Sequence, residues 1–314
     1  MEEDAMPERS NHDRVDLVEV APRDGFQSIE APIPTQDKIE IVEGLLNAGF
    51  HRMEVGSVVS PKAVPQMADI AELFKAVEGR GKAGLSLLVP NAKGAEIALN
   101  IGCEALVFVV SVSETHNRRN VRRSVDQSLQ ELADIMSVIG ADNAVSLRID
   151  LATAFDCPFD GDVPVDAVRR VHQEARRLAP KAEVALCDTT GRADPYRVGD
   201  RFGVMIAEDP DTVWAFHGHD TFGMGVANAY AAYLSGVRVF DAAAAGLGGC
   251  PFAPGASGNT AMEDLVYAFA RAGVATGIDL PRLLDAADRV AVLPGGQAAS
   301  HLRVVPRDRI PLTS

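Results

Sequence analysis

The sequence predicts an α/β protein built as a (β/α)8 TIM barrel with an extra C-terminal helix. From Val15 onward, short apolar runs alternate with longer stretches in which apolar residues recur every three or four positions, the pattern of repeated strand–helix units. The number of these units is eight, and eight units in roughly 260 residues match the usual size of this barrel. A doubly wound sheet fits less well, because the first turn reads A-P-R-D-G-F-Q and not the glycine-rich turn that binds dinucleotides.

Each expected strand is a short, mostly apolar run. In chain order, the strands are expected at residues 15–21, 52–56, 85–89, 105–110, 145–151, 184–188, 213–219 and 239–244. Amphipathic patterns predict helices at 35–48, 121–139, 165–178, 195–206 and 224–235, with a further helix at 262–272 after the last strand. Residues 15–275 would therefore form the catalytic barrel.

The two ends of the chain depart from this pattern. Residues 1–14 are rich in charge and lack apolar periodicity, which predicts a flexible N-terminal segment. Residues 276–314 predict a helical appendix, with a helix at 280–292 and a proline-containing tail that has no evident partner.

Composition excludes several classes of function. The 44 acidic and 30 basic side chains give a net charge of -14, which disfavours binding to nucleic acid and to anionic membrane surfaces. We find no apolar run of the roughly 18 residues that a membrane helix needs. The four cysteines show no C-x-x-C spacing, and the chain opens with acidic and polar residues, so a cytoplasmic protein is expected. Any anionic ligand must be bound by a local cluster of cations.

In such a barrel, the reacting groups stand at the carboxyl ends of the strands. The polar residues that the sequence places there, or in the loop after the last strand, are Arg23, Asp24, Glu54, Ser111, Ser113, Asp150, Asp188, His217, His219, Cys250 and Asn259.

The histidine pair is the most informative motif among them. His217 and His219 are two residues apart on an expected strand, so both side chains point to the same face. With the carboxylate of Asp24 and the amide oxygen of Asn259 they form a mixed nitrogen and oxygen set, which suits Mg²⁺ or Mn²⁺ better than zinc. Two hydrogen-bonded polar residues at a strand end are the alternative interpretation, and the convergence of Asp24 favours the metal.

Three further residues suggest acid–base or electrostatic roles. Arg23 could donate to an oxyanion that forms during a reaction, or could form an ordinary ion pair with Glu54 or Asp188. Glu54 fits the role of a positioning partner better than that of a base. Cys250 lies in a loop, residues 246–259, with five glycines and two prolines. A thiol with a pKa of about 8.5 in such a lid could carry a proton.

The densest basic cluster is H-N-R-R-N-V-R-R at residues 116–123. It opens an expected helix, so it could hold the phosphates of a nucleotide-like carrier at the helix N-terminus. A solvated helix face that balances nearby acids is an equally good interpretation.

Four segments carry a family resemblance. They read P-R-D-G-F-Q at 22–27, M-E-V-G-S-V-V-S-P-K-A-V-P-Q-M-A-D at 53–69, F-H-G-H-D-T-F-G at 216–223 and G-L-G-G-C-P-F-A-P-G-A-S-G-N at 246–259. These segments resemble the 3-hydroxy-3-methylglutaryl-CoA lyase family of barrel metallolyases, which is related to isopropylmalate and homocitrate synthases. One departure is that Ser28, Ile29 and Glu30 stand where the family usually has other residues, so the walls of the acyl pocket are expected to differ.

The resemblance implies roles for individual residues. The divalent-metal ligands would be Asp24, His217, His219 and Asn259. The other implied roles are an enolate-stabilising arginine at Arg23, an active-site glutamate at Glu54, the acid after the sixth strand at Asp188 and a mobile-loop catalytic cysteine at Cys250.

Taken together, the residues and the resemblance predict an acyl-CoA lyase that depends on Mg²⁺ or Mn²⁺. It would cleave a 3-hydroxy-3-methylglutaryl-CoA-like thioester by retro-aldol chemistry to acetyl-CoA and a keto acid. The general base stays open between Asp188 and a His217 that dissociates from the metal. A lyase or aldolase for another substrate, such as a citramalyl-CoA-like ester or a free hydroxy acid, is the nearer alternative, and a non-catalytic acyl-CoA-binding barrel is the distant one. The resemblance suggests a homodimer or larger homo-oligomer. We assign substrate or CoA binding to Gln27, Ser113, Arg118 and Arg119.

Overall fold

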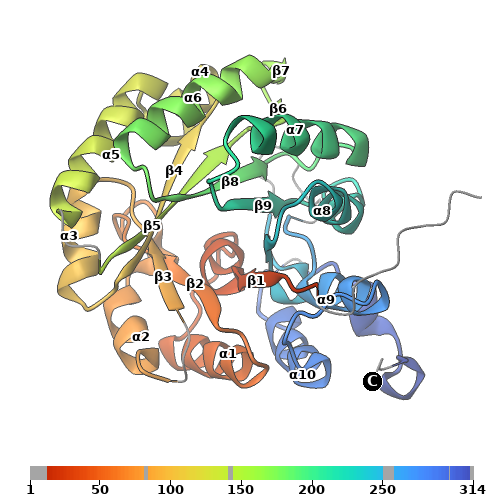
Figure 1. The fold of residues 1–314 in the computed structure, drawn as a ribbon. Coiled ribbons are helices and arrows are strands. Elements are labelled where there is room, and N and C mark those ends of the chain that lie inside the picture. Colours follow the sequence, from red (N-terminus) through yellow and green to blue (C-terminus); the bar gives the residue numbers. More distant parts are fainter. Residues whose placement is uncertain (1–12, 81–83, 141–143, 250–257, 297, 312–314) are drawn as a thin grey trace, which may run out of the picture.

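A closed barrel of eight parallel strands forms the centre of the molecule, with helices around it (Figure 1). The computed structural model describes residues 13–80, 84–140, 144–249, 258–296 and 298–311. Around the barrel, the strands follow the order β1-β10-β9-β8-β5-β4-β3-β2. The predicted fold class is confirmed. The strands are β1 (Asp16–Glu19), β2 (Arg52–Ser57), β3 (Gly84–Leu88), β4 (Ala105–Ser111), β5 (Ser146–Ala152), β8 (Glu183–Asp188), β9 (Trp214–Gly218) and β10 (Val239–Ala242).

A two-stranded antiparallel hairpin lies in the loop after β5. It consists of β6 (Asp156–Cys157) and β7 (Gly161–Asp162), in which Cys157 pairs with Gly161. The sequence analysis did not predict this hairpin, because each strand has only two residues and no alternating pattern can develop over that length.

The alternation of side chains along the strands separates a polar interior from an apolar exterior. In β5, Leu147 and Leu151 face the helices, whereas Arg148 and Asp150 face inward and are bonded to each other. On the outer side of β9, Phe216 meets rings from the neighbouring segments, including an edge-on contact with Phe155 at 6.1 Å between ring centroids. Apolar packing thus lies between the strands and the helices, and the barrel interior is left for charged groups.

Ten α-helices are found in the described part of the chain. They are α1 (Thr35–Asn47), α2 (Ile70–Val77), α3 (Ala92–Asn100), α4 (Glu114–Val121), α5 (Val125–Ile139), α6 (Val165–Leu178), α7 (Pro195–Glu208), α8 (Gly225–Leu234), α9 (Met262–Arg271) and α10 (Leu280–Ala291).

The prediction of a single helix at 121–139 is wrong. The chain instead forms α4, which ends at Val121, and α5, which begins at Val125. Arg122 adopts a left-handed conformation (φ 58°) and ends α4. Two residues later, Ser124 caps α5 and exchanges hydrogen bonds with Gln127, which is a complete capping box. The strong N-cap signal at Ser124 therefore overrides the continuous amphipathic pattern.

The C-terminal segment packs against the barrel helices. The predicted extra helix is present as α10, which contacts α1 and α9. The tail that we expected to lack a partner is bound: the Asp264 carboxylate of α9 accepts from the backbone N–H groups of His301 and Leu302 at 2.8 and 2.7 Å. Ile310 near its end is buried. The flexible segment expected at 1–14 lies almost wholly outside the described residues.

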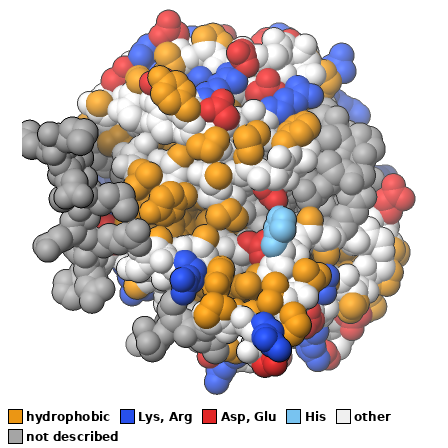
Figure 2. Space-filling model, turned by 90° about the vertical axis from the view of Figure 1, so that its right-hand side faces the viewer, with side chains coloured by type: hydrophobic (Ala, Val, Ile, Leu, Met, Phe, Trp, Pro, Cys, Tyr) orange, Lys and Arg blue, Asp and Glu red, His pale blue; other side chains and the backbone are white. Residues whose placement is uncertain are grey.

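Charged side chains of both signs mix at the surface. On the face drawn in Figure 2, Lys and Arg side chains alternate with Asp and Glu along the upper edge, while hydrophobic side chains lie across the middle. Within the described chain, every helix is too short or too polar to cross a membrane.

Candidate active site

The first strand ends in a tight turn that positions two site residues. The carbonyl of Val20 accepts from the N–H groups of Arg23 and Asp24 at 3.1 and 2.8 Å, in a π-helical turn over Ala21–Gly25. Below the turn, the buried Glu19 carboxylate accepts from Ala21 N at 2.8 Å and from Ala244 N at 2.9 Å. The turn after β1 is therefore fixed to the loop after β10.

The histidines and Asn259 are held together by backbone pairing. His219, just after β9, forms an antiparallel bridge with Asn259, and Thr260 N donates to the Gly218 carbonyl at 3.1 Å. The Asn259 side chain approaches Gly248 so closely that a Cβ at Gly248 would lie 2.6 Å from Asn259 Nδ2. Glycine is required at that position, because any side chain would displace the asparagine.

Asp24, His217 and His219 converge as the sequence predicts. Each offers one ligand atom, and these atoms lie within 4.8 Å of one another. Asn259 joins them, since its Nδ2 donates to Asp24 Oδ2 at 2.9 Å. Its own Oδ1 and the Nδ1 of His219 are buried and have no hydrogen-bond partner among the described residues. Buried orphan acceptors in a mixed nitrogen and oxygen set fit a divalent cation.

Electrostatics favour cation binding here. Burial opposes ionisation of Asp24, but the charges of Arg23, His217 and His219 outweigh it and lower the pKa of Asp24 to about 2. Burial lowers the pKa of His219 to about 4, with His217 adding to the effect. At neutral pH the aspartate is thus ionised and His219 is neutral, which are the forms that bind metal.

Arg23 lies between two carboxylates. Its guanidinium contacts Asp24 and bonds Glu54 Oε2 at 2.9 Å. Burial raises the pKa of Glu54 to about 7, although Arg23 partly offsets the effect. The Nε of Arg23 is buried and has no partner in the described chain.

Behind His217 lies an acid–base network that sequence reasoning missed. His217 Nδ1 lies 3.1 Å from Asp241 Oδ2, and Asp241 accepts two hydrogen bonds from Arg148 at 2.8 and 2.5 Å. Burial disfavours the charged ring, but the hydrogen bond and charge of Asp241 raise the pKa of His217. The sequence feature that could have indicated this network is the presence of charged residues, Arg148 and Asp241, within the expected strands.

A cavity of about 540 Å³ opens at the carboxyl ends of the strands. It is lined by Arg23, Asp24, Gln27, His217 and His219, so the structure brings these predicted residues to one site. Gly249, next to the predicted catalytic Cys250, also lines it. Cys250 itself lies outside the described residues.

Asp188 is not brought to this cavity. Its Oδ2 accepts from Ala193 N at 3.2 Å, in the loop that leads to α7. The neighbouring residues Cys187 and Thr189 line the cavity instead. Burial raises the pKa of the Asp188 carboxyl to about 7. The alternation along β8 explains this placement, because residue 188 faces away from the barrel when residue 187 faces inward.

Three residues assigned to substrate binding make other contacts. Ser113 caps α4, accepting from His116 N and donating to Asp160 at 2.7 Å. Arg118 pairs with Glu114 at 2.6 Å, and the Arg119 guanidinium stacks on Phe159 at 4.1 Å from the ring centroid.

Other members of the same basic cluster and its surroundings do line the cavity, namely His116, Asn120, Arg123, Ser60 and Asn91. The sequence correctly indicated that the basic cluster at residues 116–123 lies near the cavity. Which of its side chains face the cavity depends on the rotation of helix α4 about its axis. Because α4 has only eight residues before its C-cap at Arg122, the direction of its side chains could not be predicted from the pattern alone.

Fold and site together define a (β/α)8-barrel enzyme with a candidate divalent-cation centre. The family model described as HMGL-like matches residues 14–290, and the chain belongs to this family. It is 39% identical over 288 residues to a 3-hydroxy-3-isohexenylglutaryl-CoA/hydroxy-methylglutaryl-CoA lyase of Pseudomonas aeruginosa, covering 92% of this chain and 95% of the relative. An (R)-citramalyl-CoA lyase of Chloroflexus aurantiacus is 39% identical, with 90% and 91% covered.

Solved structures agree with this assignment. An HMG-CoA lyase from Acinetobacter baumannii, in complex with coenzyme A and 3-methylmalate, has a TM-score of 0.88 at 36% identity and covers 98% of this chain and 99% of that one. The chain is therefore a carbon–carbon lyase, which confirms the predicted family and enzyme class.

Proposed function

We propose that this lyase cleaves a 3-hydroxy-3-methylglutaryl-CoA-like tertiary hydroxyacyl thioester to acetyl-CoA and a keto acid. The observation that carries the proposal is the convergence of Asp24, His217 and His219 within 4.8 Å, beside the Arg23 guanidinium in one cavity. These three residues and Asn259 would hold Mg²⁺ or Mn²⁺. When bound, such a cation supplies Lewis acidity at the substrate oxygens and lowers the pKa of the hydroxyl group.

The side chains of the cavity then have separate tasks. A base removes the proton of the tertiary hydroxyl, a carbonyl forms, and the electrons of the breaking carbon–carbon bond move into the thioester enolate. Arg23 lines the cavity, and its guanidinium would stabilise that developing negative charge. His217 lines the cavity whereas Asp188 does not, which favours His217 as the base in a state in which its Nε2 would not be bound to the cation. Cys250 would return a proton to the enolate carbon and release acetyl-CoA.

The acyl group has one specific alternative. The relative from Chloroflexus is a citramalyl-CoA lyase at the same identity as the Pseudomonas relative, so a citramalyl-CoA-like ester is the second candidate substrate. The solved relative with coenzyme A bound supports a CoA thioester in either case. Residues such as Asn120 and Arg123, which line the cavity, are the candidate contacts to the carrier.

A coupled assay of acetyl-CoA release tests the proposal. The purified protein is incubated with 3-hydroxy-3-methylglutaryl-CoA, citramalyl-CoA and the corresponding free hydroxy acids, with and without EDTA. We expect turnover of a thioester that EDTA abolishes and that added Mn²⁺ or Mg²⁺ restores. Turnover of only a free acid, or turnover that is insensitive to EDTA, would contradict it.

The assembly and location suggested by the sequence are part of this proposal. A homodimer or larger homo-oligomer is tested by light scattering of the purified protein, and a cytoplasmic location by cell fractionation.

A further inference from the structure

We infer that Asp241 is a positioning residue that fixes the tautomer and orientation of His217, with Arg148 holding Asp241 in place. This inference rests on the cation site proposed above. It concerns how the protein prepares that site, and it is independent of which thioester is cleaved.

The first step of the argument concerns the proton between the two side chains. His217 Nδ1 lies 3.1 Å from Asp241 Oδ2. An ionised carboxylate can only accept a hydrogen bond, so the proton of this bond belongs to the ring nitrogen. The lone pair of the neutral ring is then on Nε2, the nitrogen left for a cation. Metal-binding histidines are commonly oriented by such a carboxylate.

The second step is that Asp241 itself cannot turn. Arg148 donates from Nη1 to Asp241 Oδ1 at 2.8 Å and from Nη2 to Oδ2 at 2.5 Å. This two-point contact fixes the plane of the carboxylate. The side chains of Asp241 and Arg148 are only 2% and 7% exposed, so water competes little for these bonds.

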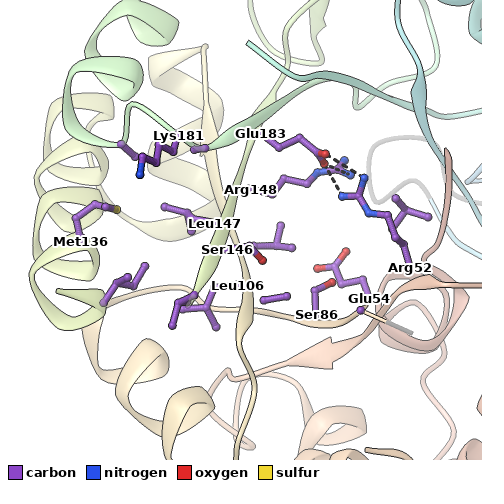
Figure 3. Close-up of a pocket in the computed structure, with 18 of the residues that line it drawn as sticks. Arg52, Glu54, Ser86, Leu106, Met136, Ser146, Leu147, Arg148, Lys181 and Glu183 are labelled. Atoms are coloured by element: carbon purple, nitrogen blue, oxygen red, sulfur yellow. Dashed lines mark hydrogen bonds and ion pairs between the residues drawn. The ribbon is translucent and has the colours of Figure 1, made fainter. Parts of the chain in front are cut away.

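Arg148 is held in turn by a residue of its own strand, β5, and by one of the neighbouring strand β8. Its Nε donates to Asp150 Oδ1 at 2.7 Å, and its Nη1 lies 3.4 Å from Glu183 Oε1. Glu183 also accepts two hydrogen bonds from Arg52, at 3.0 and 2.8 Å. Figure 3 shows Arg52, Glu183 and Arg148 meeting at the wall of a second cavity of about 550 Å³, on the side of the barrel opposite to the ligand cavity.

The placement of the network separates positioning from catalysis. His217 and Asp150 line the ligand cavity at the carboxyl ends of the strands, and Arg148 and Glu183 line the second cavity at the opposite side of the barrel. Asp241 lies between them and is not among the lining residues of either cavity. It therefore does not reach a substrate, and its effect must pass through His217.

The wild-type protein provides the first test, which needs no variant to fold. Metal-free protein labelled with ¹⁵N in histidine is studied by NMR at a pH above which the His217 signals no longer shift, so that the ring is neutral. We expect His217, identified by its loss in His217→Gln, to carry its proton on Nδ1. A His217 ring protonated on Nε2 would overturn the inference.

A matched pair of variants provides the second test. Asp241 Oδ2 accepts from both the His217 ring and Arg148 Nη2, and Oδ1 accepts from Nη1; the NH₂ of Asp241→Asn therefore opposes either the ring and Nη2 or Nη1, and at least one bond is lost in either orientation. We expect the Mn²⁺ dissociation constant, measured by electron paramagnetic resonance, to rise about 10–100-fold, the usual effect of losing such a partner. Glu183→Gln changes a carboxylate on the same arginine that does not touch His217, and its Mn²⁺ affinity should stay within about twofold of the wild type.

Two results would overturn the inference and leave the proposed function standing. One is wild-type Mn²⁺ affinity in Asp241→Asn, and the other is an equal loss in both variants, which would indicate a purely structural network. His219→Ala serves as the reference, because Mn²⁺ retention in that variant would instead contradict the cation site itself.

Discussion

Replacing Arg23 with methionine tests the electrostatic part of the mechanism. The arginine uses one terminal nitrogen for Asp24 and the other for Glu54, and keeps a buried Nε donor without a partner in the described chain. Methionine retains part of the volume and removes every donor. Losing one donor to a developing oxyanion costs about 2.7–4 kcal/mol, so kcat should fall about 10²–10³-fold.

The assay is acetyl-CoA release with the best substrate of the panel, together with Mn²⁺ binding and thermal unfolding. Metal binding should persist, because Asp24, His217 and His219 remain. The buried Glu54 loses its cation in this variant, so a second variant, Arg23→Met with Glu54→Gln, removes the unpaired carboxylate. We expect the double variant to regain thermal stability and not kcat. A kcat within about threefold of wild type in Arg23→Met would refute the assigned role.

Three further predictions follow from the same site. His219→Ala should lose Mn²⁺ or Mg²⁺ on gel filtration, and stoichiometric metal by elemental analysis would argue against this ligand. Cys250→Ala should lower acetyl-CoA release about 10²-fold or more with metal affinity unchanged, as expected for a lost general acid, and wild-type rates would eliminate the thiol as proton carrier. Burial raises the pKa of Glu19 from 4.5 to about 8, so its neutral form is favoured in the fold and its stabilisation is lost as pH rises through that window. Relative to Glu19→Gln, which cannot ionise, the wild-type free energy of unfolding should therefore fall by up to about 1.4 kcal/mol per pH unit between these values. Denaturant titrations at several pH values measure the difference, and parallel curves would show that Glu19 is already charged in the folded protein.

The sequence contained enough information for the fold because repetition strengthens a weak signal. Any one apolar run, such as residues 85–89, could be a strand or part of a buried helix, but eight in alternation with helical patterns favour a single architecture. The convergence of the two histidines could be predicted for a related reason. The H-x-H spacing of His217 and His219 places both rings on one face whatever the exact strand ends are.

Side-chain direction at the ends of elements was harder to predict. Asp188 is the last residue of β8, and a shift of one residue decides whether it faces the ligand cavity or the helices. Arg118 and Arg119 depend in the same way on the phase of a short helix. Asp241 and Arg148 were missed because a charged residue within an apolar run carries no sign of its partner, which comes from a different strand.

The close contact between Gly249 and Gly258 bears on the exchange of loop segments between related enzymes. A Cβ on Gly258 would lie 2.5 Å from Gly249 N, so Gly249 and Gly258, which flank residues 250–257, lie in close contact. Asn259, the residue after Gly258, forms a backbone bridge with His219. A relative's segment in place of residues 251–257, with Cys250 kept, should therefore leave Asn259 paired with His219 at the proposed cation site.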